Sequence, residues 1–175
     1  TALLWAAHWD DLAIADLLVR AGADVTAADD HGVTPIERAA ENASLAMVEK
    51  LLAAGGDPNA TQTSGLTPLM TAARTGDAQV VGALLSSGAD VNAATIETDS
   101  TALMWAVAAP NRDIVHVLLE SSADVHASSN KGFTPLLFAA RNGDIEMARL
   151  LIAAGADVNE PGSDGTLPLP YSIIA

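Results

Sequence analysis

The chain has 175 residues, enough for one sizeable core. Its formal net charge of −14 argues against binding to nucleic acids or anionic membranes, because affinity for phosphates comes largely from Lys and Arg side chains. The absence of cysteine excludes disulfides and thiolate metal sites. It leaves the compartment open, with the cytoplasm slightly favoured over the periplasm or the exterior.

A short motif recurs along the chain at nearly constant spacing. Its copies, a Thr followed by Pro or Ala and then by Leu or Ile, begin at Thr1, Thr34, Thr67, Thr101 and Thr134, at intervals of 33, 33, 34 and 33 residues. A degraded sixth copy begins at Leu167. The spacing predicts a single array of units over 1–33, 34–66, 67–100, 101–133 and 134–166, with a partial unit over 167–175.

Each unit is expected to contain two helices. The first begins at the motif, where Thr34 is a good N-cap and Pro35 suits the first helical position. In the same unit Glu37 completes a capping box and should reach back to the amide of Thr34. A second N-cap residue follows ten positions after each opening Thr, and a buried apolar stripe follows it, from Ile14 in the first unit to Ile152 in the last. These caps are Asp11, Ser44, Asp77, Asn111 and Asp144.

The end of the second helix also follows a pattern. Most units place a glycine there, which suits the left-handed backbone that stops a helix. The fourth unit has Ser122 instead and should be a weak point of the array. The glycines are Gly22, Gly55, Gly88 and Gly155.

Both ends of the array depart from the pattern. The first unit lacks the turn that would precede Thr1, and the last contains Pro170 within its partial helix. Terminal units need polar outer faces, and Ile173 and Ile174 do not provide one. We therefore expect a fragment of a longer array, whose uncapped ends can self-associate.

These features resemble the ankyrin repeat over essentially the whole chain: a Thr-Pro-Leu start, and a Gly-Ala-Asp-Val-Asn sequence or a near variant after the second helix. The resemblance implies a mainly α solenoid of helix-turn-helix units joined by β-hairpin-like loops. It also implies that another protein binds to a concave face formed by the hairpin tips and the first helices. The acidic charge favours a partner with a basic or neutral surface.

Positions that vary between units should mark this face, although drift at solvated sites is the competing explanation for each. Candidates at the tips are Asp30, His31, Val33, Ser64, Leu66, Ile96, Glu97, Asp99, Lys131 and Phe133. Candidates on the first helices are Trp5, His8, Trp9, Glu41, Asn42, Arg74, Thr75, Trp105, Phe138, Arg141 and Asn142.

Aromatic side chains form a series within these candidates. Trp5, Trp105 and Phe138 occupy the same position of their first helices and are either binding anchors or packing between units. Aromatic and cationic side chains concentrate toward the C-terminal end of the array, where we expect the energetic centre of binding. This group comprises Trp105, Lys131, Phe133, Phe138 and Arg141.

The tip over residues 95–100 is one residue longer than its counterparts. It has Asp99 where other tips have glycine, so its local conformation should differ. It is either a specificity loop or a tolerated surface insertion.

Catalytic and metal chemistry have little support in the sequence. The four histidines show no paired helical spacing, and the glycines are spaced as helix ends and turns rather than as a phosphate cradle. We expect no catalytic residue, no metal and no cofactor. The sequence therefore predicts a protein-binding module, with a passive spacer or a regulatory segment of a larger enzyme as the alternatives; the uneven tips favour the first.

Overall fold

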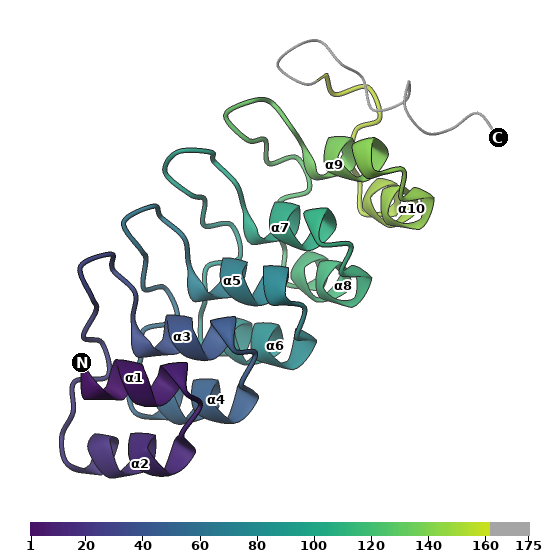
Figure 1. Ribbon diagram of the computed structural model, residues 1–175. Coiled ribbons are helices and arrows are strands. Elements are labelled where there is room, and N and C mark those ends of the chain that lie inside the picture. The colour runs from purple at the N-terminus through teal and green to yellow at the C-terminus, as the bar shows by residue number, and fades with distance from the viewer. Residues whose placement is uncertain (162–175) are drawn as a thin grey trace.

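The structure is a computed structural model that describes residues 1–161, which form a row of helical hairpins (Figure 1). Within this range the sheet structure is limited to one isolated antiparallel bridge, between Ala94 and Thr101. The predicted partial unit 167–175, with Leu167, Pro170, Ile173 and Ile174, lies outside the described residues. The helices are α1 Ala2–His8, α2 Leu12–Arg20, α3 Pro35–Glu41, α4 Leu45–Ala53, α5 Pro68–Thr75, α6 Ala78–Ser86, α7 Ala102–Ala108, α8 Arg112–Glu120, α9 Pro135–Asn142 and α10 Ile145–Ala153.

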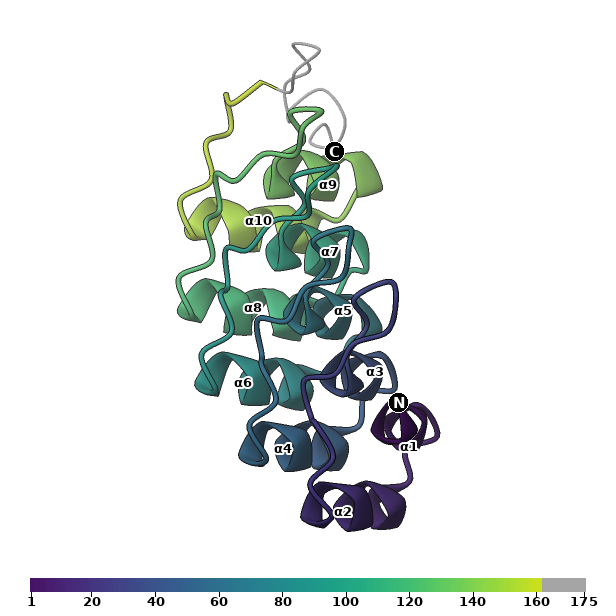
Figure 2. The ribbon, with the colours of Figure 1, turned by 90° about the vertical axis from the view of Figure 1, so that its left-hand side faces the viewer.

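The helices stack in two layers. The odd-numbered first helices form one layer and the even-numbered second helices form the other, as the turned view in Figure 2 shows. Long loops project beside the first helices and connect each unit to the next (Figure 1). The prediction of a mainly α solenoid is therefore confirmed.

The predicted helix caps account for where the helices begin. Each opening Thr hydroxyl accepts a hydrogen bond from the backbone N–H three residues later, as Thr67 does from Met70 at 3.3 Å. Before the second helices, the cap side chain accepts a backbone N–H in every unit except the fourth. There, Asn111 Nδ2 donates to the Ala73 carbonyl of the preceding unit, at 3.1 Å.

The core is a continuous strip between the two layers. Small residues at the centre of each first helix are fully buried, for example Ala39 and Ala40, and allow close stacking. At the start of the second-helix stripe Met47 is fully buried, whereas Ile14 is 49% exposed. The prediction that Ile14 is buried is wrong, because within residues 1–161 α2 has a neighbouring second helix, α4, on one side only.

An asparagine after the second helix ties neighbouring units together. Asn59 Nδ2 donates to the Gly88 carbonyl at 2.9 Å, and Asn59 Oδ1 accepts from the Asp90 N–H at 2.7 Å. Asn92 makes the same pair of bonds to the fourth unit. His126 holds this position in the fourth unit and instead places Nδ1 3.5 Å from a carboxylate oxygen of Glu160. The junction between the fourth and fifth units therefore lacks the amide bridge.

The backbone of Ser122 is left-handed, with φ at 68°, as predicted. Replacing Ser122 with glycine should raise the free energy of unfolding by about 1 kcal/mol, because a Cβ in this conformation costs an energy of that order. Urea denaturation measures the change, and Gly88→Ser, in the same position of the third unit, should cause a loss of similar size. An unchanged or lower midpoint for Ser122→Gly would show that the serine is not strained.

Glu37 does not form the predicted capping box. Thr34 Oγ1 accepts from the Glu37 N–H, but the Glu37 carboxyl points into the next unit, so the prediction is wrong. Glu37 Oε1 accepts from Thr71 Oγ1 at 2.5 Å and from Gln62 Nε2 at 3.0 Å, while Oε2 is buried without a partner. The reason is the packing of the array: the other units place a buried apolar residue here, such as Met70, against their neighbours.

Burial raises the pKa of the Glu37 carboxyl, opposed by the hydrogen bonds from Thr71 and Gln62. As pH rises above the ordinary pKa of a glutamate, the carboxyl of Glu37 loses its proton in the unfolded chain before it does so in the folded chain. The contribution of Glu37 to stability therefore falls as pH rises through that window.

Glu37→Gln should remove this pH dependence. The free energy of unfolding of Glu37→Gln minus that of the unsubstituted chain should increase from pH 4 to pH 7, measured by urea denaturation at each pH. Glu41→Gln, at an exposed site of the same helix, serves as the control. A difference that stays constant with pH would contradict the expected ionisation.

Candidate functional site

The loops between units form a continuous ledge of hairpin tips. Each tip is closed by a backbone bond such as that from the Asp29 N–H to the Val33 carbonyl, 3.0 Å. Neighbouring tips are joined by further backbone bonds, for example from the Thr63 N–H to the His31 carbonyl, 2.9 Å. We call the hairpin tips and the exposed parts of the first helices the hairpin face.

The longer third tip differs in backbone from its counterparts, as expected. The Thr95 N–H donates to the Ser100 carbonyl at 3.1 Å, one residue further along than the bond from Asp29 to Val33, and the Asp99 N–H donates to the Thr95 carbonyl, four residues back. Asp99 itself, with φ at 50°, keeps the left-handed conformation that Gly65 has at 80°. The extra residue is accommodated elsewhere in the hairpin, where the Thr95 hydroxyl is 2.7 Å from the Thr98 hydroxyl. The tip presents Ile96, which is 72% exposed.

Four of the predicted site residues belong partly or wholly to the scaffold. Val33 is buried and Leu66 is half-buried against the core. Asn42 Nδ2 donates to the Ala7 and His8 carbonyls of the first unit, at 2.9 and 2.8 Å. Thr75 Oγ1 donates within its helix and lies 3.4 Å from the Ala40 carbonyl of the second unit. The side chains of these four residues pack in the core or bond to a neighbouring unit, so their first role is structural.

Most of the other candidates are exposed on the hairpin face, with Trp105, Phe133 and Phe138 only half-buried. The exposed set is Trp5, His8, Trp9, Asp30, His31, Glu41, Ser64, Arg74, Ile96, Glu97, Asp99, Lys131, Arg141 and Asn142.

The C-terminal end of this face carries paired aromatic and cationic side chains. The rings of Phe133 and Phe138 lie 5.4 Å apart, and the Arg141 guanidinium is 5.8 Å from the centre of the Phe133 ring. The guanidinium of Arg74 covers Trp105 in the same way, at 5.9 Å. The structure therefore brings Phe133, Phe138 and Arg141 of the predicted group together, whereas Trp105 pairs with Arg74 of the third unit. Each of these contacts joins two neighbouring units.

The N-terminal end carries a more exposed aromatic cluster. Trp5 is 60% exposed and Trp9 is 73% exposed. His8 lies between them, with ring centres 5.6 Å from Trp5 and 4.9 Å from Trp9 and with no face-to-face stacking. Trp5 and His8 also line a depression of about 280 Å³, with Thr1, Leu4, Asp29 and Arg38.

Charge differs between the two ends of the hairpin face. Beside the N-terminal cluster, the backbone N–H of Val33 and that of His31 hold the pKa of Asp29 below its usual value, so this carboxylate stays charged. The nearby Arg38 is paired with Glu41 at 2.7 Å. The C-terminal end instead presents the exposed cationic side chains of Lys131 and Arg141, and Arg74 is exposed in the third unit.

A family model described as ankyrin repeats (3 copies) matches residues 1–62, 36–129 and 95–162. The chain belongs to the ankyrin-repeat family. Members of this family are generally protein–protein interaction modules and are typically non-catalytic. No curated protein matches the chain.

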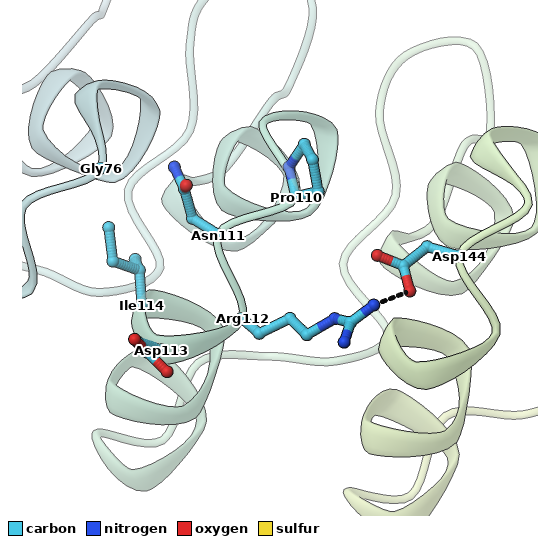
Figure 3. A pocket seen from close by; sticks show the side chains of 7 residues that line it. All are labelled: Gly76, Pro110, Asn111, Arg112, Asp113, Ile114 and Asp144. Carbon is cyan, nitrogen blue, oxygen red and sulfur yellow. Dashed lines mark hydrogen bonds and ion pairs between the residues drawn. The ribbon is translucent and has the colours of Figure 1, made fainter.

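Two of the hollows in residues 1–161 of the ankyrin array lie beside the fourth unit, away from the hairpin tips. The first, about 410 Å³, lies where first helices lead into second helices and is lined by Gly76, Pro110 and Asn111, among others (Figure 3). The ion pair between Arg112 and Asp144, 2.7 Å, crosses it and joins the fourth and fifth units. The second is a groove of about 790 Å³ between α8 and α10.

The described part of the ankyrin array carries no group of three or more His, Asp or Glu side chains arranged to hold a metal ion. Over residues 1–161, none of the helices combines the length and the apolar character needed to cross a membrane. His8 and His31 lie in the first unit and its tip, whereas His116 and His126 belong to the fourth unit.

The outer face of α2 leaves apolar side chains exposed, with Ile14 at 49% and Leu17 at 68%. We expect this face to drive association of the array with itself, because exposed apolar surface of this kind favours contact between molecules. The double variant Ile14→Lys/Leu17→Lys should reduce concentration-dependent association in sedimentation velocity. Ala46→Lys on the exposed side of α4 is the control, and equal association in all three proteins would exclude this face.

Proposed function

We propose that this ankyrin array is a non-catalytic module that binds another protein on its hairpin face. The observation that carries the proposal is the row of exposed, unit-specific side chains on a rigid ledge. Large apolar groups such as Trp5 and Ile96 stand there beside charged groups such as Arg141. Exposed aromatic and arginine side chains are the types most enriched where binding energy concentrates.

The polar groups of the array support a binding role over a catalytic one. Asp11 and Asp144 accept backbone hydrogen bonds as helix caps, and Asp29 accepts two in its hairpin. Their carboxylates are committed to the fold. In a passive spacer, exposed tryptophan and isoleucine side chains would lower the solubility of the protein without contributing to its function.

Site-directed photo-crosslinking tests the binding face. A benzoylphenylalanine photo-crosslinker is incorporated in turn at His31, Ile96, Glu49 or Glu120, all exposed. The first two lie on the hairpin face, and the last two lie on the second helices as matched controls. Each protein is irradiated in an extract of cells that express the array, and the adducts are identified by mass spectrometry.

The same protein should be captured from His31 and Ile96 and not from Glu49 or Glu120. Adducts from the second-helix positions alone would move the site to the other layer. Absence of a specific adduct at every position would favour the spacer. A catalytic domain joined to this array in the full-length protein would favour the regulatory alternative.

A further inference from the structure

Ile96, on the third hairpin tip, is the one large apolar side chain that is exposed among residues 34–133. It is 72% exposed. The other large apolar side chains that the described residues expose belong to the first and fifth units. Ile96 has a neighbouring tip on each side, and backbone hydrogen bonds join its own tip to both of them. Its exposure is therefore a property of the interior of the array.

The two neighbouring tips hold Ile96 in a fixed position. The Ile96 N–H donates to the Ser64 carbonyl of the preceding tip at 2.9 Å, and the Asn130 N–H of the following tip donates to the Thr98 carbonyl at 3.0 Å. A Cβ on Gly65 would lie 3.0 Å from Ile96 Cγ1, so one side of the isoleucine side chain rests against this glycine. The opposite side is open. A side chain that is ordered before binding loses less entropy when a partner covers it.

Hydroxyl groups brace the same tip from within. The Thr95 hydroxyl, which is buried, lies 2.7 Å from the Thr98 hydroxyl and accepts from the Ser100 N–H at 3.0 Å. The Thr98 hydroxyl in turn lies 2.9 Å from the Ser100 hydroxyl. These contacts order the longer tip, which favours a specificity loop over a tolerated surface insertion.

The fold of a tip does not require an apolar side chain at this position. The backbone N–H that bonds to the preceding tip belongs in turn to Thr63, Ile96 and Asn130, so these three residues are counterparts. Thr63 and Asn130 are polar and exposed. An exposed isoleucine at a position where polar residues serve equally well in neighbouring tips indicates contact with another molecule.

The charges beside Ile96 indicate the kind of surface that it meets. Glu97 and Asp99 are both exposed, and the tip over residues 95–100 contains no cationic side chain. Asn130 Nδ2 donates to the Glu97 carbonyl, which fixes the backbone from which one of these carboxylates projects. The tip therefore presents one apolar side chain between two negative charges.

We propose that Ile96 inserts into an apolar pocket of the partner protein, with Glu97 and Asp99 facing Lys or Arg side chains at the rim of that pocket. This inference rests on the proposed function, whose partner it characterises. Burial of the isoleucine supplies affinity, since apolar surface leaves water. Opposite charges at the rim supply specificity and speed association.

Ile96→Thr tests the apolar contact. The probe is the protein that benzoylphenylalanine at His31 captures, purified after its identification. Threonine keeps the branched Cβ and is the residue at this position of the preceding tip, so thermal denaturation should be unchanged. The affinity for the probe in titration calorimetry should fall about 10- to 100-fold. Thr63→Ala, at the counterpart position, is the matched control and should bind with full affinity.

The double variant Glu97→Gln/Asp99→Asn tests the charged rim. Asparagine accepts the positive φ of Asp99, so the backbone of the tip is retained. Affinity for the same probe at low ionic strength should fall about threefold to tenfold. Binding should also become less sensitive to salt, because two charge pairs that salt screens are removed.

Full affinity of Ile96→Thr for a protein captured from His31 would leave the proposed function intact and remove only this inference. Unchanged or stronger binding of Glu97→Gln/Asp99→Asn would overturn the basic rim. Self-association of the array in sedimentation velocity that Ile96→Thr abolishes would assign Ile96 to a contact between two copies of the chain and overturn the pocket. Absence of a specific adduct from both His31 and Ile96 would overturn the proposed function and this inference with it.

Discussion

Replacing Pro110 with glycine should raise the free energy of unfolding by about 1–2 kcal/mol. Pro110 has φ at 22°, whereas the pyrrolidine ring favours about −65°. Strain at such a site costs about 1–3 kcal/mol, and the greater freedom of glycine in the unfolded chain offsets up to about 1 kcal/mol. Every unit connects its two helices through a residue of positive φ at this position: Asp10, Ala43, Gly76, Pro110 and Gly143.

Urea denaturation followed by tryptophan fluorescence measures this gain, because Trp105 lies in the same unit. Pro110→Ala is the matched control and should stabilise less than glycine, since alanine frees the ring constraint but keeps a Cβ in the left-handed region, as Ala43 does with φ at 53°. If Pro110→Gly leaves the midpoint unchanged or lowers it, the connection in the fourth unit is not strained.

Several departures from the repeat pattern gather in the fourth unit. Pro110 and Ser122 both adopt positive φ without being glycine. Asn111 makes no cap bond to its own helix, and His126 lacks the amide bridge that Asn92 forms one unit earlier. α8 and α10 also contact each other less than the other neighbouring second helices do. Since each repeat is stabilised mainly by its neighbours, these losses weaken one junction rather than the whole array.

Local chemistry explains why much of the fold could be predicted. A Thr hydroxyl three residues before a free backbone N–H, or a glycine at a helix end, acts within a few residues of the chain. The caps at Thr34 and Thr67 and the left-handed Ser122 are therefore confirmed. Pro110 was not predicted, although the aligned units place Gly76 and Gly143 at its position and so indicate the left-handed backbone there.

Interactions between units could not be predicted in the same way. Glu37 and Asn59 fit the pattern of their own unit, but their side chains reach partners 34 and 29 residues away. The direction of these side chains is set by packing of the next hairpin, which no single-unit pattern contains. The candidate site shows the same limit. Val33 varies between units and is nevertheless buried, and Phe133, at the same position of the fourth unit, is half-buried against Phe138.

Because Phe133 is half-buried, Arg141 is the better residue for testing the C-terminal end of the hairpin face. Phe133→Ala would remove the ring that packs against Phe138 and carries Arg141, so any loss of binding would mix with loss of stability. Arg141 is exposed, and its guanidinium lies over the Phe133 ring. Its truncation removes a planar cation from the surface and leaves the core untouched.

Arg141→Ala should weaken binding of the crosslinked partner by about 1–3 kcal/mol, because exposed arginines on aromatic surfaces are common centres of binding energy. Titration calorimetry measures the affinity, and thermal denaturation should show little change. Arg141→Lys keeps the charge but loses the planar stacking, so it should recover only part of the affinity. Glu49→Ala and Glu120→Ala, on the second helices, should mainly alter the association rate. Full affinity in Arg141→Ala, with loss in the second-helix variants, would place the partner on the opposite face.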